Sequence, residues 1–377
     1  MSFHLTDWVL LRYMHALHQK DQRDRSFKAV DPQKVFSILV VSTTGLGDTV
    51  LSTPAIHAVR RTFPQAKITG HFHKKYIDLF NGHPHLDQVI AYEGTYNRRY
   101  KKFLSTIKAF RKEKFDLVFI FHGNDPQAVP MAYLSGAPVI LRRPSTGKFA
   151  FLLSNPQGEE DYFSEHAIIG RLKTAQLAGC PVDDRRMILS PKAFNFDELN
   201  KFYRAIGLPA DSPKVAFQPG ASYAYKCWPE SRFIDLGRKL LKKDPRLTIL
   251  ILGNRKEKQL CNRIFKGMDS PRVFNLAGKL SIGMITALIK ELGLLVTNDT
   301  GPLHIAIALG TKTVSFFGPT SPDLFGPLQD LERHWVFYQK PDCEPCLLKK
   351  CPDPHCLTRL PVDTVLSACE KQLYENE

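Results

Sequence analysis

The feature that most constrains the fold of this sequence is an alternation of short apolar runs and helix-like segments, which occurs twice. The first series starts at Ser37 with SILVVSTT, a run typical of a buried strand, and continues to APVILRR. The second starts after Pro213 with KVAFQPG and continues to KTVSFFGP. Strands that alternate with helices build parallel sheets covered by helices. The sequence therefore predicts an α/β protein with two doubly wound, Rossmann-like domains.

The points where this alternation stops and restarts predict the domain organisation. Residues 1–30 form an N-terminal extension, residues 31–190 a first domain and residues 191–377 a second domain, as suits a chain of 377 residues. In the extension, apolar residues from Phe3 to Leu17 recur at roughly helical spacing. This helix lies either in a membrane interface or against the domain body, and the sequence leaves both possibilities open. We expect a cleft between the two domains.

Ligands of open α/β sheets bind beyond the carboxyl ends of the strands. The loop after the first strand contains GLGD, with Gly45, Gly47 and Asp48. It is a poor dinucleotide fingerprint, because the third glycine of G-x-G-x-x-G would fall at Val50. Asp48 at a helix start either caps backbone amides or acts as a general base toward a hydroxyl. In the second case the glycines admit an acceptor close to the backbone.

Two further loops in the second series carry polar groups suited to a phosphorylated ligand. In FQPGASYAYKCWPE, Ser222 can donate a hydrogen bond to a phosphate and Lys226 can supply a positive charge. In VTNDTGPLHIAIALG, Thr300 and Gly301 open a helix whose first amides suit a phosphate, and Asp299 can bind sugar hydroxyls. Alternatively, Lys226 is an ordinary solvated surface lysine, and the residues around Thr300 only cap the helix.

The motifs GLGDTVLSTPA, PGASYAYKCWPE and NDTGPLHIAIALGTKTVSFFGPTSP follow one another in this order. Together they closely resemble the ADP-heptose–lipopolysaccharide heptosyltransferases, glycosyltransferase family 9, which have the GT-B fold of two Rossmann-like domains facing a central cleft. The resemblance covers the chain from Ser37 to its C-terminal region. It implies an inverting transfer of heptose from ADP-L-glycero-D-manno-heptose to a lipopolysaccharide inner-core acceptor, with no cofactor for catalysis.

The same resemblance implies roles for individual residues. The first domain would hold the acceptor, with Asp48 as the general base beside Gly45 and Gly47. The second would hold the donor, with Lys226 at the diphosphate and the transferred sugar and Asp299 at the heptose hydroxyls. The other donor positions are Ser222 near the phosphates, Glu257 at the ribose, Leu280 against the adenine, and Thr300 and Gly301 at the diphosphate-binding turn.

A cysteine cluster near the C-terminus, CEPCLLKKCPDPHC, contains Cys343, Cys346, Cys351 and Cys356. Four thiols at this density can form a tetrahedral site, so we expect a structural zinc or iron there, with His355 as a possible substitute ligand. Scattered structural thiols are the alternative, and disulfides fit poorly with a reducing compartment.

The charge balance bears on the partners. Lys and Arg number 52 against 37 Asp and Glu, a formal net charge of +15, which favours anionic partners. We expect an anionic membrane surface as well as donor and acceptor, but no nucleic acid, because no nucleic-acid motif is present. We expect a cytoplasmic protein, peripheral on the inner face of the inner membrane. The rival functions are a protein O-heptosyltransferase, a sugar-nucleotide epimerase of similar fold, and a non-enzymatic basic module that binds nucleic acid or membrane.

Overall fold

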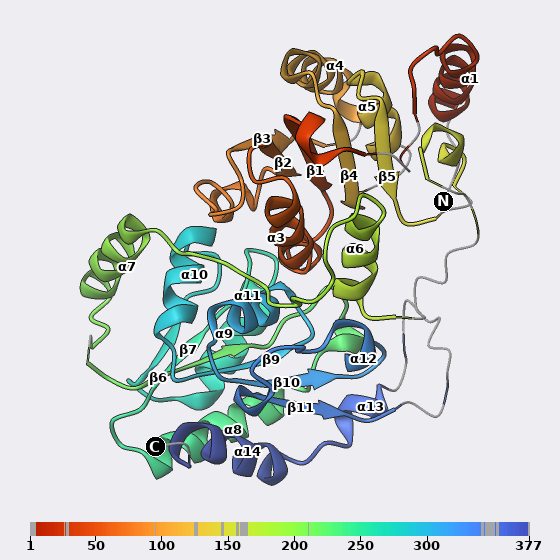
Figure 1. The fold of residues 1–377 in the computed structure, drawn as a ribbon. Helices are drawn as coiled ribbons and strands as arrows, with labels where there is room; N and C mark the ends of the chain where they lie inside the picture. The colour runs from red at the N-terminus through yellow and green to blue at the C-terminus, as the bar shows by residue number, and fades with distance from the viewer. Residues whose placement is uncertain are drawn as a thin grey trace. The chain divides into compact units, whose positions relative to one another are not determined.

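The fold is that of a computed structural model, which describes residues 5–25, 27, 30–94, 96–123, 127–144, 147–155, 158, 165–209, 211–340, 343, 351 and 354–375 (Figure 1). The chain divides into two compact units, Met1–Met187 and Ile188–Glu377. Each unit contains one parallel sheet with helices on both of its faces, and each is described by itself.

Unit 1 is built on a five-stranded sheet in the order β3-β2-β1-β4-β5. All neighbouring strands are parallel. The strands are β1 (Ser37–Ser42), β2 (Lys67–His73), β3 (Gln88–Tyr92), β4 (Leu117–His122) and β5 (Val139–Arg142). The helices are α1 (Leu5–Gln19), α2 (Leu46–Val50), α3 (Thr53–Thr62), α4 (Tyr96–Glu113), α5 (Ala128–Leu134) and α6 (Ala167–Gln176). Short 3-10 turns occur at η1 (Pro32–Lys34), η2 (Ile77–Leu79) and η3 (Ala150–Leu152).

Side chains that alternate along the strands of unit 1 form apolar layers on the two faces of its sheet. On one face, Leu39 and Val118 pack with residues from α1, α4 and α5 in a single core cluster. Helices α3 and α6 contact each other, and α6 also contacts β4 and β5. Helix α1 contributes the fully buried Met14 to the cluster, so it packs on the domain body along one side. Its Trp8, Val9 and Tyr13 are exposed.

Unit 2 is built on a six-stranded parallel sheet in the order β11-β10-β9-β6-β7-β8. The strands are β6 (Lys214–Gln218), β7 (Thr248–Ile251), β8 (Val273–Asn275), β9 (Leu294–Asn298), β10 (Thr313–Phe317) and β11 (His334–Tyr338). The helices are α7 (Ala193–Ala205), α8 (Glu230–Lys243), α9 (Lys258–Met268), α10 (Ile282–Glu291), α11 (Gly301–Leu309), α12 (Pro322–Phe325), α13 (His355–Thr358) and α14 (Val362–Tyr374). The 3-10 turns are η4 (Ala224–Lys226) and η5 (Leu331–Arg333).

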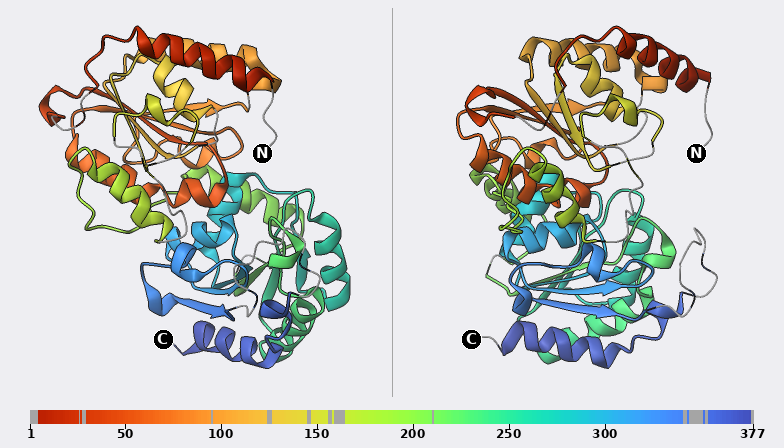
Figure 2. Two further views of the ribbon diagram at one scale, coloured as in Figure 1. Left: turned by 90° about the vertical axis from the view of Figure 1, so that its right-hand side faces the viewer. Right: turned by 45° about the vertical axis from the view of Figure 1, so that its right-hand side comes forward.

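The core of unit 2 also has two layers. Strand residues such as Phe217 and Phe316 pack under α8, α9 and α14, where Trp228 is fully buried and stacks on Phe316. Helices α7, α10 and α11 pack in series, and α11 contacts β9 and β10 (Figures 1 and 2). Unit 2 is thus a doubly wound sheet, as the alternating sequence predicts.

The strand orders place one topological switch point in each unit. In unit 1 the chain starts at the central β1, moves outward to β3 and then returns to β4 on the other side of β1. In unit 2 it starts at β6, moves outward to β8 and returns to β9. The loops after such a central pair diverge and leave a crevice at the carboxyl ends of the strands, where ligands of this fold bind. The crevices expected to be functional therefore follow β1 and β4, and β6 and β9.

Candidate functional site

Asp48 lies at the switch point of unit 1, in the short helix α2 that follows β1. Its Oδ2 accepts hydrogen bonds from the Gly45 amide at 3.3 Å and from the Thr44 hydroxyl at 3.1 Å. A Cβ at Gly45 would lie 3.0 Å from Oδ2, so this glycine leaves room for the carboxylate to fold back over the loop. The capping role that the sequence left open is therefore present. The capping hydrogen bonds use Oδ2, whereas Oδ1 has other neighbours.

Two residues from other elements lie beside Oδ1 of Asp48. The guanidinium of Arg171 in α6 donates to it at 3.2 Å, and Nε2 of His122 at the end of β4 lies 3.7 Å away. The other ring nitrogen of His122 is hydrogen-bonded to Thr44. Asp48 is 28% exposed, so solvent reaches the carboxylate. This arrangement holds the Asp48 carboxyl group in place, where a hydroxyl group can approach it.

Burial lowers the pKa of His122 to about 4, against an opposing effect of Asp48 and with further lowering by Arg171 and Arg142. The imidazole is therefore neutral near pH 7. The pKa of Tyr76, just before η2, is raised by burial and by the negative charge of Asp48. Sequence reasoning missed Thr44, His122, Arg171 and Tyr76. Only His122 carried a signal, as the polar end of an otherwise apolar strand.

Lys226 and Asp299 lie together at the switch point of unit 2. Lys226 ends η4 after β6, and its Nζ donates to Oδ2 of Asp299 at 2.8 Å. The Thr320 hydroxyl, after β10, donates to the same oxygen at 2.6 Å. His304 of α11 lies 4.0 Å from Oδ1. The sequence placed Lys226 and Asp299 in loops that share an edge of the sheet, and gave no sign of Thr320.

Charge and burial compete at Asp299. Burial alone raises the pKa of this carboxyl group, but Lys226, His304 and the Thr320 hydrogen bond together outweigh it, so the net pKa is lowered. Asp299 is thus a carboxylate at neutral pH. Its neighbour Asn298 fixes the loop after β6, because its side chain accepts from the Trp228 amide at 2.9 Å and donates to the Pro219 carbonyl at 2.8 Å. This fully buried amide side chain holds the two loops together.

Glu257 lies just before α9, after the neighbouring strand β7. Its Oε2 accepts from the Asn254 amide at 2.8 Å and from the Gln218 side chain at 3.4 Å. Its carboxylate lies directly against Gly220, where an added Cβ would come within 2.3 Å of Oε1. A side chain at position 220 would force the Glu257 carboxylate to move, so Gly220 lets Glu257 lie against the loop that carries Lys226.

The remaining predicted donor residues lie at the same edge of the sheet. Thr300 precedes α11 and makes no side-chain cap, while Gly301 begins the helix. Ser222 is exposed in the loop after β6, and Leu280 is half-buried after β8, next to Ser281, which caps α10. The structure thus brings the donor-side residues to the carboxyl ends of β6, β7, β8 and β9. Their roles stay predictions.

The cysteine cluster is described only in part. Cys343 is exposed, Cys351 is half-buried and Cys356 is buried, whereas Cys346 lies outside the described residues. Within the described ranges, no group of three or more His, Cys, Asp or Glu side chains is placed to hold a metal ion. The metal site therefore stays a prediction.

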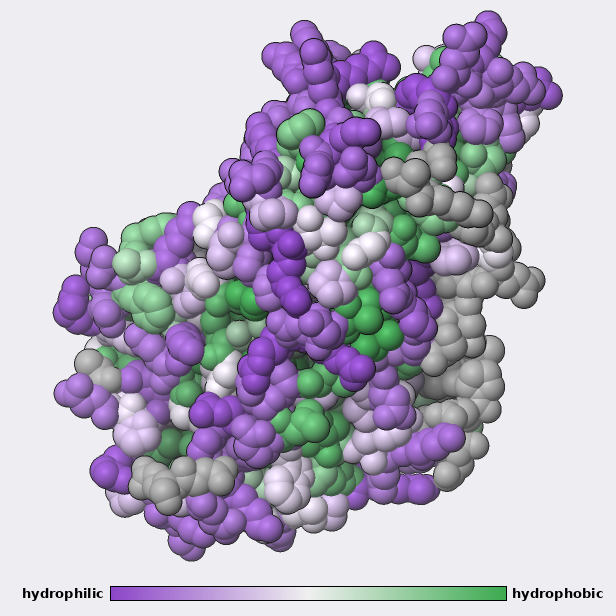
Figure 3. Space-filling model, viewed as in Figure 1, coloured by the Kyte–Doolittle hydropathy of each residue, from purple (hydrophilic) through white to green (hydrophobic). Residues whose placement is uncertain are grey.

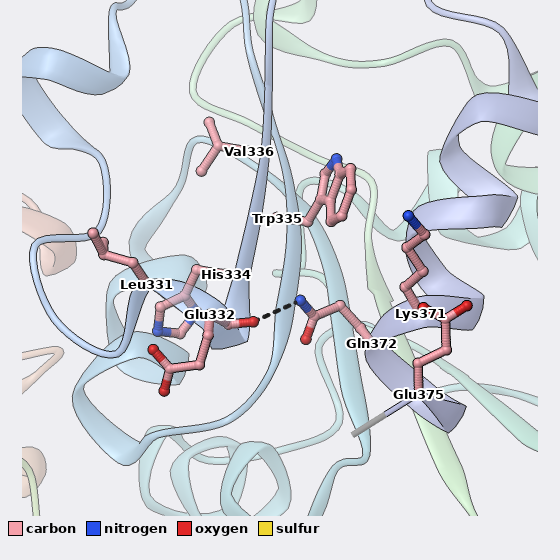
Figure 4. A pocket seen from close by; sticks show the side chains of 8 residues that line it. All are labelled: Leu331, Glu332, His334, Trp335, Val336, Lys371, Gln372 and Glu375. Atoms are coloured by element: carbon pink, nitrogen blue, oxygen red, sulfur yellow. Dashed lines mark hydrogen bonds between the residues drawn. The ribbon is translucent and has the colours of Figure 1, made fainter. Parts of the chain in front are cut away.

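A pocket of about 540 Å³ lies elsewhere in unit 2 (Figure 4). It is lined by residues of η5, the first part of β11 and the end of α14, and Gln372 donates to the Glu332 carbonyl at 3.0 Å. These strand residues are at the amino-terminal end of β11. Because the strands are parallel, the pocket lies at the opposite end of the strands from the predicted residues, which follow their carboxyl ends. It is not part of the candidate site.

Comparison with known proteins agrees with this architecture. The chain is 29% identical to lipooligosaccharide heptosyltransferase 2 of Campylobacter jejuni, over 89% of this chain and 98% of that protein. The solved structure of a glycosyltransferase of family 9 from Veillonella parvula matches with a TM-score of 0.77 and 21% identity, covering 90% of this chain and 98% of that one. An Escherichia coli ADP-heptose LPS heptosyltransferase II matches with a TM-score of 0.74 and 19% identity, covering 90% and 99%. These likenesses confirm the predicted GT-B class of fold.

The sequence profile of glycosyltransferase family 9 (heptosyltransferase) matches residues 105–356, most of the chain. This stretch includes the end of β4 with His122, the loop with Lys226 and the start of α11. The resemblance identified from three motifs is thereby confirmed over both units. The chain belongs to glycosyltransferase family 9, the heptosyltransferases, and is a transferase enzyme.

Proposed function

We propose that this enzyme transfers heptose from ADP-L-glycero-D-manno-heptose to an acceptor in the lipopolysaccharide inner core, with inversion at the anomeric carbon. The observation that carries the proposal is the Lys226–Asp299 pair beside the start of α11. It combines a cation for a diphosphate with a carboxylate for sugar hydroxyls. Relatives named for heptose transfer to lipooligosaccharide or lipopolysaccharide support the donor and acceptor class.

In this proposal, unit 2 binds the donor. Lys226 and the amides at Thr300 and Gly301 bind the diphosphate, because a helix start carries a partial positive charge. Ser222 adds a hydrogen bond to the phosphates. Asp299 accepts hydrogen bonds from the heptose hydroxyls. Glu257 binds the ribose and Leu280 packs on the adenine, which fits the half-buried position of each.

Nζ of Lys226 donates a hydrogen bond to Oδ2 of Asp299 at 2.8 Å. The diphosphate therefore shares the ammonium group with the carboxylate, and both charges are held in place before the reaction. As the bond between the anomeric carbon and the phosphate oxygen breaks, its electron pair stays on ADP. One well-placed donor to such a developing charge stabilises the transition state by about 3–4 kcal/mol.

Asp48 acts as the general base on the acceptor. It accepts the proton of the acceptor hydroxyl, and the oxygen forms the new glycosidic bond on the face opposite to the departing ADP, which gives inversion. Gly45 and Gly47 carry no side chains in the loop before Asp48, which leaves room for a bulky acceptor to approach. The exposed part of the Asp48 side chain supports this role.

A transfer assay tests the proposal. Purified protein receives a panel of sugar nucleotides together with truncated lipopolysaccharide acceptors, and the products are weighed by mass spectrometry. We expect heptose addition from ADP-heptose in the wild type, and no addition by Asp48→Asn, which still binds ADP. Heptose found on a protein and not on the lipopolysaccharide would show that the acceptor is a polypeptide. Release of an epimerised sugar nucleotide without transfer would refute the proposal.

We also propose that the protein binds an anionic membrane surface peripherally on the cytoplasmic side. Helix α1 exposes Trp8, Val9 and Tyr13. Helix α4 exposes lysines beside Tyr100, and its surface is mostly hydrophilic in Figure 3. Among the described residues no helix is both long and apolar enough to cross a bilayer.

A flotation assay tests this membrane proposal. We expect binding to vesicles that contain phosphatidylglycerol, and little binding to vesicles of phosphatidylcholine alone. Binding should weaken with salt, because the attraction to anionic lipid is screened. The double substitution Trp8→Ser and Val9→Ser should reduce it further. Equal binding to neutral and anionic vesicles, or none to either, would contradict the proposal.

A further inference from the structure

Arg171 of α6 is a buried cation held against Asp48. Its side chain is only 4% exposed. The guanidinium donates to Oγ of Ser52 at 3.0 Å, to the Ala167 carbonyl at 2.7 Å and to Oδ1 of Asp48 at 3.2 Å. Of these three partners only the carboxylate brings a negative charge. A buried guanidinium without a counter-charge is strongly destabilising, so Asp48 and Arg171 depend on each other.

Other described groups beside Asp48 contribute neutral hydrogen-bond donors or rings. Thr44 and the Gly45 amide occupy Oδ2 as neutral donors. His122 approaches from β4, but it is neutral near pH 7 because burial lowers its pKa to about 4. Tyr76 is a neutral phenol, since burial and the charge of Asp48 raise its pKa. Arg142 of β5 acts on His122.

We propose that Arg171 is a positioning residue for proton transfer, which keeps Asp48 ionised and aimed before the acceptor hydroxyl arrives and drives release of the proton afterwards. This inference rests on the proposed role of Asp48 as the base. When the acceptor proton moves to Asp48, the guanidinium loses its counter-charge. The protonated state is therefore short-lived, and the proton passes from the carboxyl group to solvent water. The base is then regenerated for the next turnover.

The inference has a consequence for the pH profile that a purely structural role would not have. A neighbouring arginine lowers the pH at which a carboxyl group takes up a proton by about 1–3 units. In Arg171→Gln, the acid limb of kcat/KM should therefore move to higher pH by about 1–2 units. In Arg171→Lys, which keeps the charge, the limb should stay near that of the wild type. A misaligned base should also lower kcat about ten- to a hundredfold in both variants.

The matched control is Lys173→Met, on the same helix two residues further along. Lys173 is 59% exposed and pairs with Glu165, away from Asp48. This variant removes a positive charge of α6 without touching the carboxylate. It should retain the wild-type rate and pH profile.

A second readout measures stability and does not depend on activity. Asp48→Asn leaves the buried guanidinium without a charge partner, so it should lower the unfolding temperature. The double variant Asp48→Asn with Arg171→Gln pairs two neutral amides, so it should be more stable than either single variant. Additive losses of stability would overturn the inference. If Arg171→Gln alone does not fold, a double variant that is no more stable than Asp48→Asn would overturn it.

The outcomes separate this inference from the proposed function. If Asp48→Asn retains transfer, Asp48 is not the base and the proposed mechanism fails. If Asp48→Asn abolishes transfer while Arg171→Gln keeps the wild-type acid limb, only the role of Arg171 fails. A shifted limb together with non-additive stabilities supports both.

Discussion

The substitution Asp299→Asn tests the electrostatics of the donor site directly. The Asp299 side chain is 9% exposed and Lys226 is 17% exposed, and their charged atoms lie 2.8 Å apart. Removing one partner of a buried ion pair costs about 3–5 kcal/mol. Because Lys226 keeps some access to water, we expect a loss of about 2–3 kcal/mol in the free energy of unfolding. For a unit of this size, that corresponds to a fall of about 5–10 °C in unfolding temperature.

The same variant should separate binding of ADP from transfer of heptose. With the carboxylate neutralised, the ammonium of Lys226 no longer divides its attraction between Asp299 and the diphosphate. We therefore expect ADP to bind at least as tightly as to the wild type in calorimetric titration. Transfer should fall severely, because the heptose hydroxyls lose a charged hydrogen-bond acceptor. Weaker ADP binding with an unchanged unfolding temperature would refute this reasoning.

The pH dependence of this stability difference has a defined sign. The pKa of Asp299 is lowered in the folded protein, since Lys226, His304 and Thr320 outweigh the effect of burial. The stabilisation by its charge is therefore fully present above the ordinary carboxyl pKa near 4 and is lost as the pH falls through the lowered value. The two proteins should differ at neutral pH and converge in acid. The exposed Asp323, replaced by Asn, serves as the control and should change neither quantity.

Three further experiments test the ribose site, the diphosphate site and the cysteine cluster. Gly220→Ala places a Cβ within 2.3 Å of the Glu257 carboxylate, so the KM for the donor should rise about tenfold or more; an unchanged KM would remove Glu257 from the ribose site. Lys226→Ala should lower kcat by about a hundredfold or more, and near-normal turnover would exclude Lys226 from the diphosphate site. Elemental analysis should find one zinc or iron per chain, lost in Cys351→Ser, while transfer persists in a chelator. A metal-free active protein would contradict the cysteine-site prediction, and loss of transfer in the chelator would contradict catalysis without a metal.

The alternation of strands and helices was sufficient to predict most elements of the two sheets. The pattern does not predict α5, a seven-residue helix too short to show a helical period, or α7, which precedes the start of the second series after Pro213. It also missed β11 and α14. Strand β11 (HWVFY) is the edge strand of the sheet and is only partly buried after His334, although its residues after the histidine are apolar.

The candidate site was predictable where it depends on loops that follow recognisable strands. Asp48, Lys226 and Asp299 could be placed at the carboxyl ends of strands from local pattern alone. Arg171 could not, because it is 123 residues from Asp48 in the chain and its neighbours in α6 read as an ordinary packed helix. Thr320 follows β10, and its contact with Asp299 becomes visible only once β9 and β10 are paired. Contacts of this kind depend on strand order, which local periodicity does not encode.

The most direct test of the account is a crystal structure of the protein with bound ADP-heptose. We predict that the diphosphate lies at the start of α11 within reach of Lys226, with the heptose hydroxyls on Asp299 and the ribose near Glu257. ADP-heptose bound instead at the carboxyl ends of β1 and β4, beside Asp48, would contradict the assignment of donor and acceptor to the two units.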